Sequence, residues 1–188
     1  ATGWAPGVPN ARLGLARLAA DRSGRPGGGS GAALARIRAG LLFLALPSLV
    51  IGFWIQLAPR AFFDHFPGLG RVWVAVDGPY NEHLLRDFGA TNLALALVVL
   101  AAVARPTAAL VRLAAFASLT WQAPHTLYHL THIEALPLLG DQLAQSVVLL
   151  LGLVVALGLL WEAGRLDARS HRRGAARRAA ERPARGLA

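Results

Sequence analysis

The sequence contains four stretches of about twenty residues that are almost entirely apolar. They run over residues 39–58, 82–104, 113–133 and 142–161. A helix rises 1.5 Å per residue, so about twenty apolar residues are needed to cross the roughly 30 Å hydrocarbon core of a bilayer. Only 15% of the residues are charged, against about 25% in soluble domains. The sequence therefore predicts an all-α integral membrane protein, a four-helix bundle that spans the membrane four times.

The arginines predict the orientation of this bundle. All 19 basic residues are arginine, and 16 of them lie in residues 1–38, 105–112 and 162–188, which four crossings place on the same side. Cytoplasmic segments are enriched in basic residues, so we expect a multi-pass protein of the cell membrane with both termini in the cytoplasm. We expect the two terminal segments to be flexible, disordered basic tails. We interpret the C-terminal arginines as a topology and lipid-surface signal, not as a nucleic-acid site.

Histidines gather on the third apolar stretch, in the segment PHTLYHLTHIE. His125, His129 and His132 are spaced i, i+4 and i+7, which on a helix places them within an arc of about 60°. Trp121 and Tyr128 flank this arc. The predicted topology puts these residues on the outer side, together with the first connection and the start of the second stretch. Ionisable groups inside a membrane usually face the bundle interior and mark a site, so we expect a cluster of histidines and acids there.

The first hypothesis for this cluster is a divalent metal site. Two imidazoles spaced i, i+4 match the ligand spacing of Zn²⁺ or non-haem iron, and carboxylates supply further ligands or orient the rings. The chain has no Cys and no Met, which excludes thiolate and thioether ligands. The predicted metal ligands are His83, Asp87, His125, His129 and His132.

The second hypothesis is a pocket for a small amphipathic ligand, such as a lipid or a quinone-like molecule that enters from the outer leaflet. Glu82 and Arg86 lie one turn apart, so they can pair with each other or hold an anionic headgroup. Asn81 also suits the N-cap of the second helix. The predicted ligand-binding residues are Tyr80, Asn81, Glu82, Arg86, Trp121 and Tyr128.

Two hypotheses without a ligand stay open. The polar residues can satisfy one another and fix helix packing, and the protein is then a structural or accessory membrane subunit. The second hypothesis without a ligand is a proton relay through His125, His129 and Asp87. The chain has no Gly-rich phosphate loop and no G-x-S-x-G elbow, so nucleotide hydrolysis and serine hydrolase chemistry have no support. Association with a second copy or with a membrane partner is compatible with each hypothesis.

The segment FPGLGRVWVAVDGPYNEHLLRDFGATNLALAL (66–97), followed by PHTLYHLTH (124–132), resembles small bacterial four-helix integral membrane proteins of unassigned function. These are loosely similar to DoxX-like proteins, which share the four-span layout. The resemblance covers about residues 40–160. It implies a fold, and it carries over no catalytic residues.

Overall fold

The computed structural model of the chain describes residues 28–181. The chain divides into two compact units, Ala1–Ala35 and Arg36–Ala188. Of the first unit, the described residues 28–35 form the beginning of a helix that continues into the second unit. The remaining parts of the two predicted tails, residues 1–27 and 182–188, lie outside the described residues.

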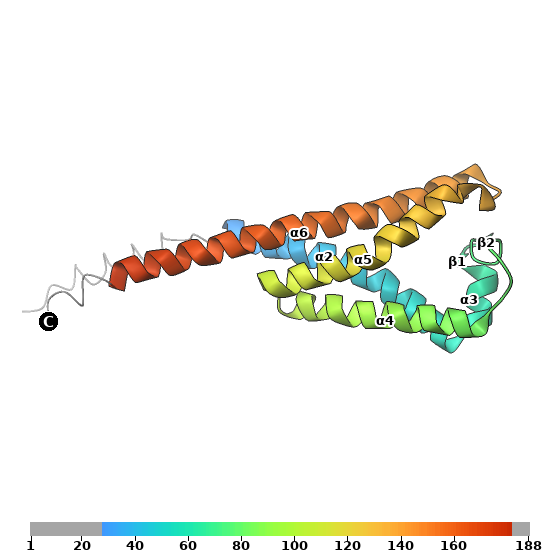
Figure 1. Ribbon diagram of the computed structural model, residues 1–188, viewed down its shortest axis with the longest axis horizontal. Helices are drawn as coiled ribbons and strands as arrows, with labels where there is room; N and C mark the ends of the chain where they lie inside the picture. Colours follow the sequence, from blue (N-terminus) through green and yellow to red (C-terminus); the bar gives the residue numbers. More distant parts are fainter. Residues whose placement is uncertain (1–27, 182–188) are drawn as a thin grey trace, which may run out of the picture. The chain divides into compact units, whose positions relative to one another are not determined.

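Helices make up most of the described chain. In the second unit, α4, α5 and α6 follow one another in alternating directions (Figure 1). A short helix and a two-stranded antiparallel hairpin occupy the connection between α2 and α4. The elements are α2 (Gly28–Leu57), α3 (Pro59–His65), β1 (Pro67–Gly68), β2 (Arg71–Val72), α4 (Glu82–Ala104), α5 (Ala108–Thr131), the 3₁₀ turn η1 (Ile133–Ala135) and α6 (Leu139–Glu181).

Three helical segments in the described part of the chain are long and apolar enough to cross a membrane. They are Gly31–Leu57, Glu82–Ala104 and Leu139–Ala179, and they contain the first, second and fourth predicted spans. The third predicted span lies on α5, whose 24 residues give a length of about 36 Å. Polar side chains near the end of α5 lower its hydropathy, and it is not among the three. The structure therefore supports an all-α membrane protein, while the fourth crossing stays a prediction.

The described parts of the two terminal segments, residues 28–38 and 162–181, are helical. α6 continues without a break to Glu181 and has 43 residues, about 65 Å, which is twice the thickness of the hydrocarbon core. α2 begins at Gly28, eleven residues before the predicted span. These observations correct the expectation of disordered tails over residues 28–38 and 162–181. The physical reason is that Ala, Leu and Arg are strong helix formers, so a packed helix extends into such a segment at little cost.

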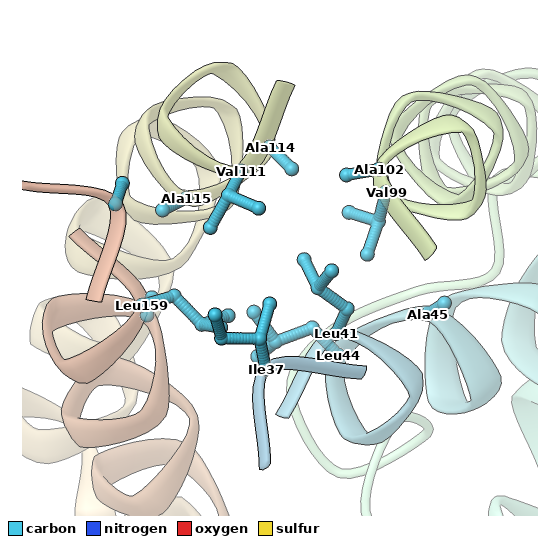
Figure 2. Packing of buried hydrophobic residues seen from close by; sticks show 12 residues of the cluster. Ile37, Leu41, Leu44, Ala45, Val99, Ala102, Val111, Ala114, Ala115 and Leu159 are labelled. Carbon is cyan, nitrogen blue, oxygen red and sulfur yellow. The ribbon is translucent and has the colours of Figure 1, made fainter. Parts of the chain in front are cut away.

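Aliphatic and alanine side chains of four helices form the core of the second unit. Figure 2 shows this cluster, with residues from α2, α4, α5 and α6 pointing toward one another. Alanines such as Ala102, Ala114 and Ala163 are fully buried, so the helix backbones approach closely. Close packing of small residues is a main source of helix association where lipid surrounds the bundle. The core includes Ile37, Leu41, Leu44, Ala45, Val99, Ala102, Val111, Ala114, Ala115, Ala156, Leu159 and Ala163.

Two glycines set the contact between α2 and α4. A Cβ atom on Gly89 would lie 2.8 Å from Cγ2 of Ile55, and one on Gly52 would lie 3.0 Å from the Gly89 carbonyl oxygen. Neither position has room for a side chain. The two helices therefore pack here backbone against backbone, about two turns from the first residue of α4.

The hairpin between α3 and α4 is fastened to the start of α6. Nη1 of Arg71 lies 3.2 Å from Oδ2 of Asp141, whose side chain is buried. The turn at Gly68, Leu69 and Gly70 has positive φ at all three residues, which glycine adopts without a steric penalty. This ion pair joins residues 70 positions apart and holds the first connection against the end of the bundle.

Candidate functional site

The histidines of α5 lie in a continuous row of aromatic rings, which we call the ring ladder (Trp121, His125, His129, Tyr128 and His132). The rings of Trp121 and His125 stack with centroids 4.6 Å apart, and His125 and His129 meet edge to face at 4.6 Å. Tyr128 contacts His129 at 5.5 Å and stacks on His132 at 4.3 Å. The predicted spacing is therefore confirmed for His125 and His129, whose rings are in contact, whereas His132 follows the last residue of α5 and contacts Tyr128.

Residues from two other segments complete the ring ladder at its sides. Phe88 of α4 lies 5.9 Å from the ring of Trp121 and 6.1 Å from that of His125. The hydroxyl of Tyr128 donates a hydrogen bond of 3.3 Å to Oδ1 of Asp77, in the connection before α4. The ring ladder thus lies where α4, α5 and the first connection meet.

The imidazoles differ in what they already bind. Nδ1 of His132 lies 2.9 Å from the Tyr128 carbonyl oxygen and 3.2 Å from Oγ1 of Thr131, so it is engaged with its own helix end. His125 and His129 have ring contacts but no hydrogen bond or ion pair within residues 28–181, and both are half-buried. Their nitrogens are consequently available for a ligand.

A buried acceptor lies one turn beyond Phe88 on α4. The side chain of Asn92 is 1% exposed, and its Nδ2 donates to the Phe88 carbonyl oxygen at 2.9 Å. Its Oδ1 has no hydrogen-bond partner among the described residues. Leaving a buried polar atom unpaired costs free energy, so this oxygen is a local cost within α4.

The predicted metal ligands do not come together. His83 and Asp87 contact each other at 3.4 Å on α4, with side chains 88% and 65% exposed. Over residues 28–181, no three side chains of His, Asp or Glu converge as metal ligands. The two residues on α4 therefore form a surface pair separate from the histidines on α5. What remains of the predicted set is the adjacent pair of His125 and His129.

Four of the predicted ligand-binding residues are engaged with one another or with the backbone. Nε of Arg86 donates to Oε1 of Glu82 at 2.8 Å, and Oε2 of Glu82 lies 3.3 Å from the Tyr80 hydroxyl. Partial burial, with the negative charge of Glu82, raises the pKa of Tyr80 above its usual value. Oδ1 of Asn81 accepts from the backbone N–H of Leu84 and caps α4 as predicted.

This acidic and basic pair also ties two helices together. Nη1 of Arg86 donates to the Gln56 carbonyl oxygen at 3.0 Å, and Nε2 of Gln56 donates to the Arg86 carbonyl oxygen at 2.6 Å. The predicted i, i+4 pairing of Glu82 and Arg86 is confirmed. Arg86 also has a second partner, Gln56, which lies on α2. Arg86 therefore has a structural role, and an anionic headgroup would have to displace these bonds.

A small hollow adjoins the ring ladder through Asp77. It has a volume of about 150 Å³ and lies between the first connection and the first turns of α4. Asn81 lines it, whereas Tyr80, Glu82 and Arg86 do not. The residues that sequence reasoning missed are Asp77 as the partner of Tyr128, and Phe88 as a ring beside the histidines. In the sequence, neither the Asp-Gly-Pro turn nor the aromatic residue at position 88 indicates which side chains it will contact.

No protein-family model, curated protein or solved structure gives a significant match to the chain. The resemblance to DoxX-like proteins therefore stays a prediction.

Proposed function

We propose that this protein crosses the cell membrane four times, with both termini in the cytoplasm, and binds a small amphipathic ligand at the ring ladder. α5 lies beside α4 and α6 and runs antiparallel to both, which supports its being the fourth crossing (Figure 1). The end with the 105–107 connection and the extension of α6 carries most of the arginines, so it is the cytoplasmic end. The ring ladder then opens toward the outer leaflet.

The observation that carries the proposal is a row of half-exposed rings that includes two imidazoles with no hydrogen bond in the described residues. Most ring nitrogens buried in a protein have a partner, because an unpaired one loses its bonds to water. Here the rings of Trp121 and His125 present flat apolar faces, and the histidine nitrogens present polar edges. A ligand with a planar ring and a polar substituent matches both.

The exposure of residues around the site supports a ligand that reaches it from the surrounding lipid. Tyr128 is 45% exposed and Leu127 is 64% exposed, so the outer part of α5 faces the surroundings of the bundle. Inward, Phe88 lies beside the rings of Trp121 and His125. A quinone-like molecule has a flat ring to stack on these rings and polar oxygens for the imidazoles.

A divalent metal is the second form of this proposal. His125 and His129 supply two imidazoles one helical turn apart, which fits part of a Zn²⁺ or non-haem iron site. The remaining ligands would have to come from water, from the bound molecule or from a second copy, because residues 28–181 offer no third converging ligand. The amphipathic ligand is therefore favoured over the metal alone.

The test uses full-length protein purified without a His tag or chelator. Quenching of tryptophan fluorescence by menadione, a naphthoquinone, should be saturable, and Trp121→Phe should remove the saturable part. We expect His125→Ala/His129→Ala to weaken the affinity about tenfold, because each ring contact contributes roughly 0.5–1.5 kcal/mol. His83→Ala, which removes an exposed histidine from α4, is the matched control and should bind as the wild type does.

Elemental analysis of the same samples, before and after incubation with zinc and iron, separates the two forms. A stoichiometric metal that the double variant loses and the control keeps would establish the metal form. Unchanged quenching in the double variant, with no metal in any sample, would overturn the proposal.

The alternative is a structural or accessory subunit, and the bonds between Arg86 and Gln56 favour it for that part of the cluster. On this alternative, His125→Ala and His129→Ala lower thermal stability in detergent and change no binding. The two outcomes are therefore distinguishable in the same set of variants.

A further inference from the structure

A second hollow lies at the opposite end of the bundle from the ring ladder, between α2 and α6. It is an open groove of about 230 Å³. Pockets that enclose a drug-sized molecule measure about 300–1,000 Å³, so this groove is suited to one segment of a larger, flexible molecule. Its walls are Ile37 and Gly40 on α2, and Val155, Gly158 and Leu159 on α6.

Two glycines shape the groove. A Cβ atom on Gly158 would have no other atom within 4 Å, so the space above this residue is unfilled. A Cβ atom on Gly40 would lie 3.3 Å from Cδ2 of Leu159, so α2 and α6 nearly touch at the floor. The apolar lining of the groove lies in the part of both helices that is apolar enough to lie in a membrane.

One end of the groove is charged. Arg36 and Arg165 each lie 3.8 Å from Oε1 of Glu162, whose side chain is 14% exposed. Two guanidinium groups share this single carboxylate, so the group carries a net charge of +1. The separations exceed hydrogen-bond distance, and each guanidinium retains donors for another anion.

An interfacial tryptophan stands beside these charges. Trp161 lines the groove, is 63% exposed, and has the guanidinium of Arg165 at 4.4 Å over its ring. Tryptophan with arginine at the end of an apolar helix is typical of the level of lipid headgroups. Along the groove, the lining therefore changes from apolar to aromatic to cationic, which is the order of acyl chain, glycerol region and phosphate in a phospholipid.

We infer that this groove binds an anionic glycerophospholipid, with an acyl chain against Gly158 and Leu159 and the headgroup phosphate at Arg36 and Arg165. The net positive charge of the group formed by Arg36, Arg165 and Glu162 selects an anionic headgroup over a zwitterionic one. The proposed topology assigns this lipid to the cytoplasmic leaflet. The site itself depends neither on that topology nor on a ligand at the ring ladder.

The experiment measures lipid retained by the full-length protein. Protein is exchanged into nanodiscs of phosphatidylcholine with increasing phosphatidylglycerol, and native mass spectrometry after release into detergent counts the bound lipids. We expect one phosphatidylglycerol to be retained in preference to phosphatidylcholine. Arg165→Gln should reduce this preference about fivefold and Arg36→Gln/Arg165→Gln further, since a basic residue near an anionic lipid surface contributes about a factor of five.

Two control variants separate the groove from general surface charge. Arg169→Gln removes an exposed arginine one turn further along α6, and it should retain the lipid as the wild type does. Gly158→Leu fills the groove and should displace the lipid, whereas Gly164→Leu, on a different face of α6, should not. Equal losses in Arg165→Gln and Arg169→Gln would overturn the inference, as would full retention in Gly158→Leu. Circular dichroism of each variant shows whether it is folded.

Discussion

The glycine contact between α2 and α4 gives a prediction that can be worked out from distances. Gly89→Ala adds one methyl group at a position where that carbon would lie 2.8 Å from Cγ2 and 2.9 Å from Cβ of Ile55. Carbon atoms in contact normally lie about 3.5–4.0 Å apart. Ile55 is fully buried and β-branched, so its side chain has no free rotamer to adopt. The helices must therefore separate locally by roughly 0.7–1.2 Å.

The matched control is Gly158→Ala, where the added carbon would meet no atom within 4 Å. Both replacements change helix propensity by the same amount, so their difference isolates the packing term. Overpacking of a tight site costs about 1–3 kcal/mol. For a chain of this size, we expect Gly89→Ala to unfold roughly 2–12 °C below Gly158→Ala.

Thermal unfolding in a mild detergent, followed by circular dichroism, measures this difference. The double variant Gly89→Ala/Ile55→Ala removes the atoms that clash, so its loss of stability should be smaller than the sum of the two single losses. Equal midpoints for Gly89→Ala and Gly158→Ala would refute the reasoning. Strictly additive losses in the double variant would refute it as well.

Arg86→Ala removes the side-chain hydrogen bond to the Gln56 carbonyl oxygen, and we expect the midpoint of thermal unfolding to fall by about 2–4 °C. Arg71→Ala leaves the buried carboxylate of Asp141 without its ion pair, so hydrogen exchange at the hairpin should increase, and adding Asp141→Asn should reverse part of this increase. Tyr80 should ionise only above pH 10, and its contribution to stability, present at lower pH, should be lost as pH rises through its raised pKa. An absorbance titration with Tyr80→Phe measures this pKa, because the chain has two tyrosines.

Local sequence signals predicted most of the helical architecture. The second predicted span coincides with α4, because the apolar run marks the helix and Asn81, directly before it, marks the N-cap. The i, i+4 spacings of Glu82 with Arg86 and of His125 with His129 also became contacts. Each of these features depends on residues within one or two turns, whose relative positions a helix fixes by itself.

The extension of α6 was missed although its signal was local. Residues 162–181 were interpreted from their charge and lack of a core, which favoured a disordered tail. Ala and Arg are strong helix formers, and α6 already supplies the nucleus, so the helix continues. Ion pairs from Glu162 to Arg36 and from Asp167 to Arg112 then hold its first turns against the neighbouring helices.

The sequence alone indicates which segments are helical and apolar, where α4 begins, and that His125 and His129 share one face of α5. Tertiary packing places His83 and Asp87 apart from those histidines, and Asp77 and Phe88 beside the ring ladder. The reason is that the rotation of a helix about its own axis is set by packing. Here the glycine contact at Gly52 and Gly89, and pairs 51 to 70 residues apart, fixed that rotation. Periodicity gives the faces of a helix, whereas contacts between distant residues decide which faces meet.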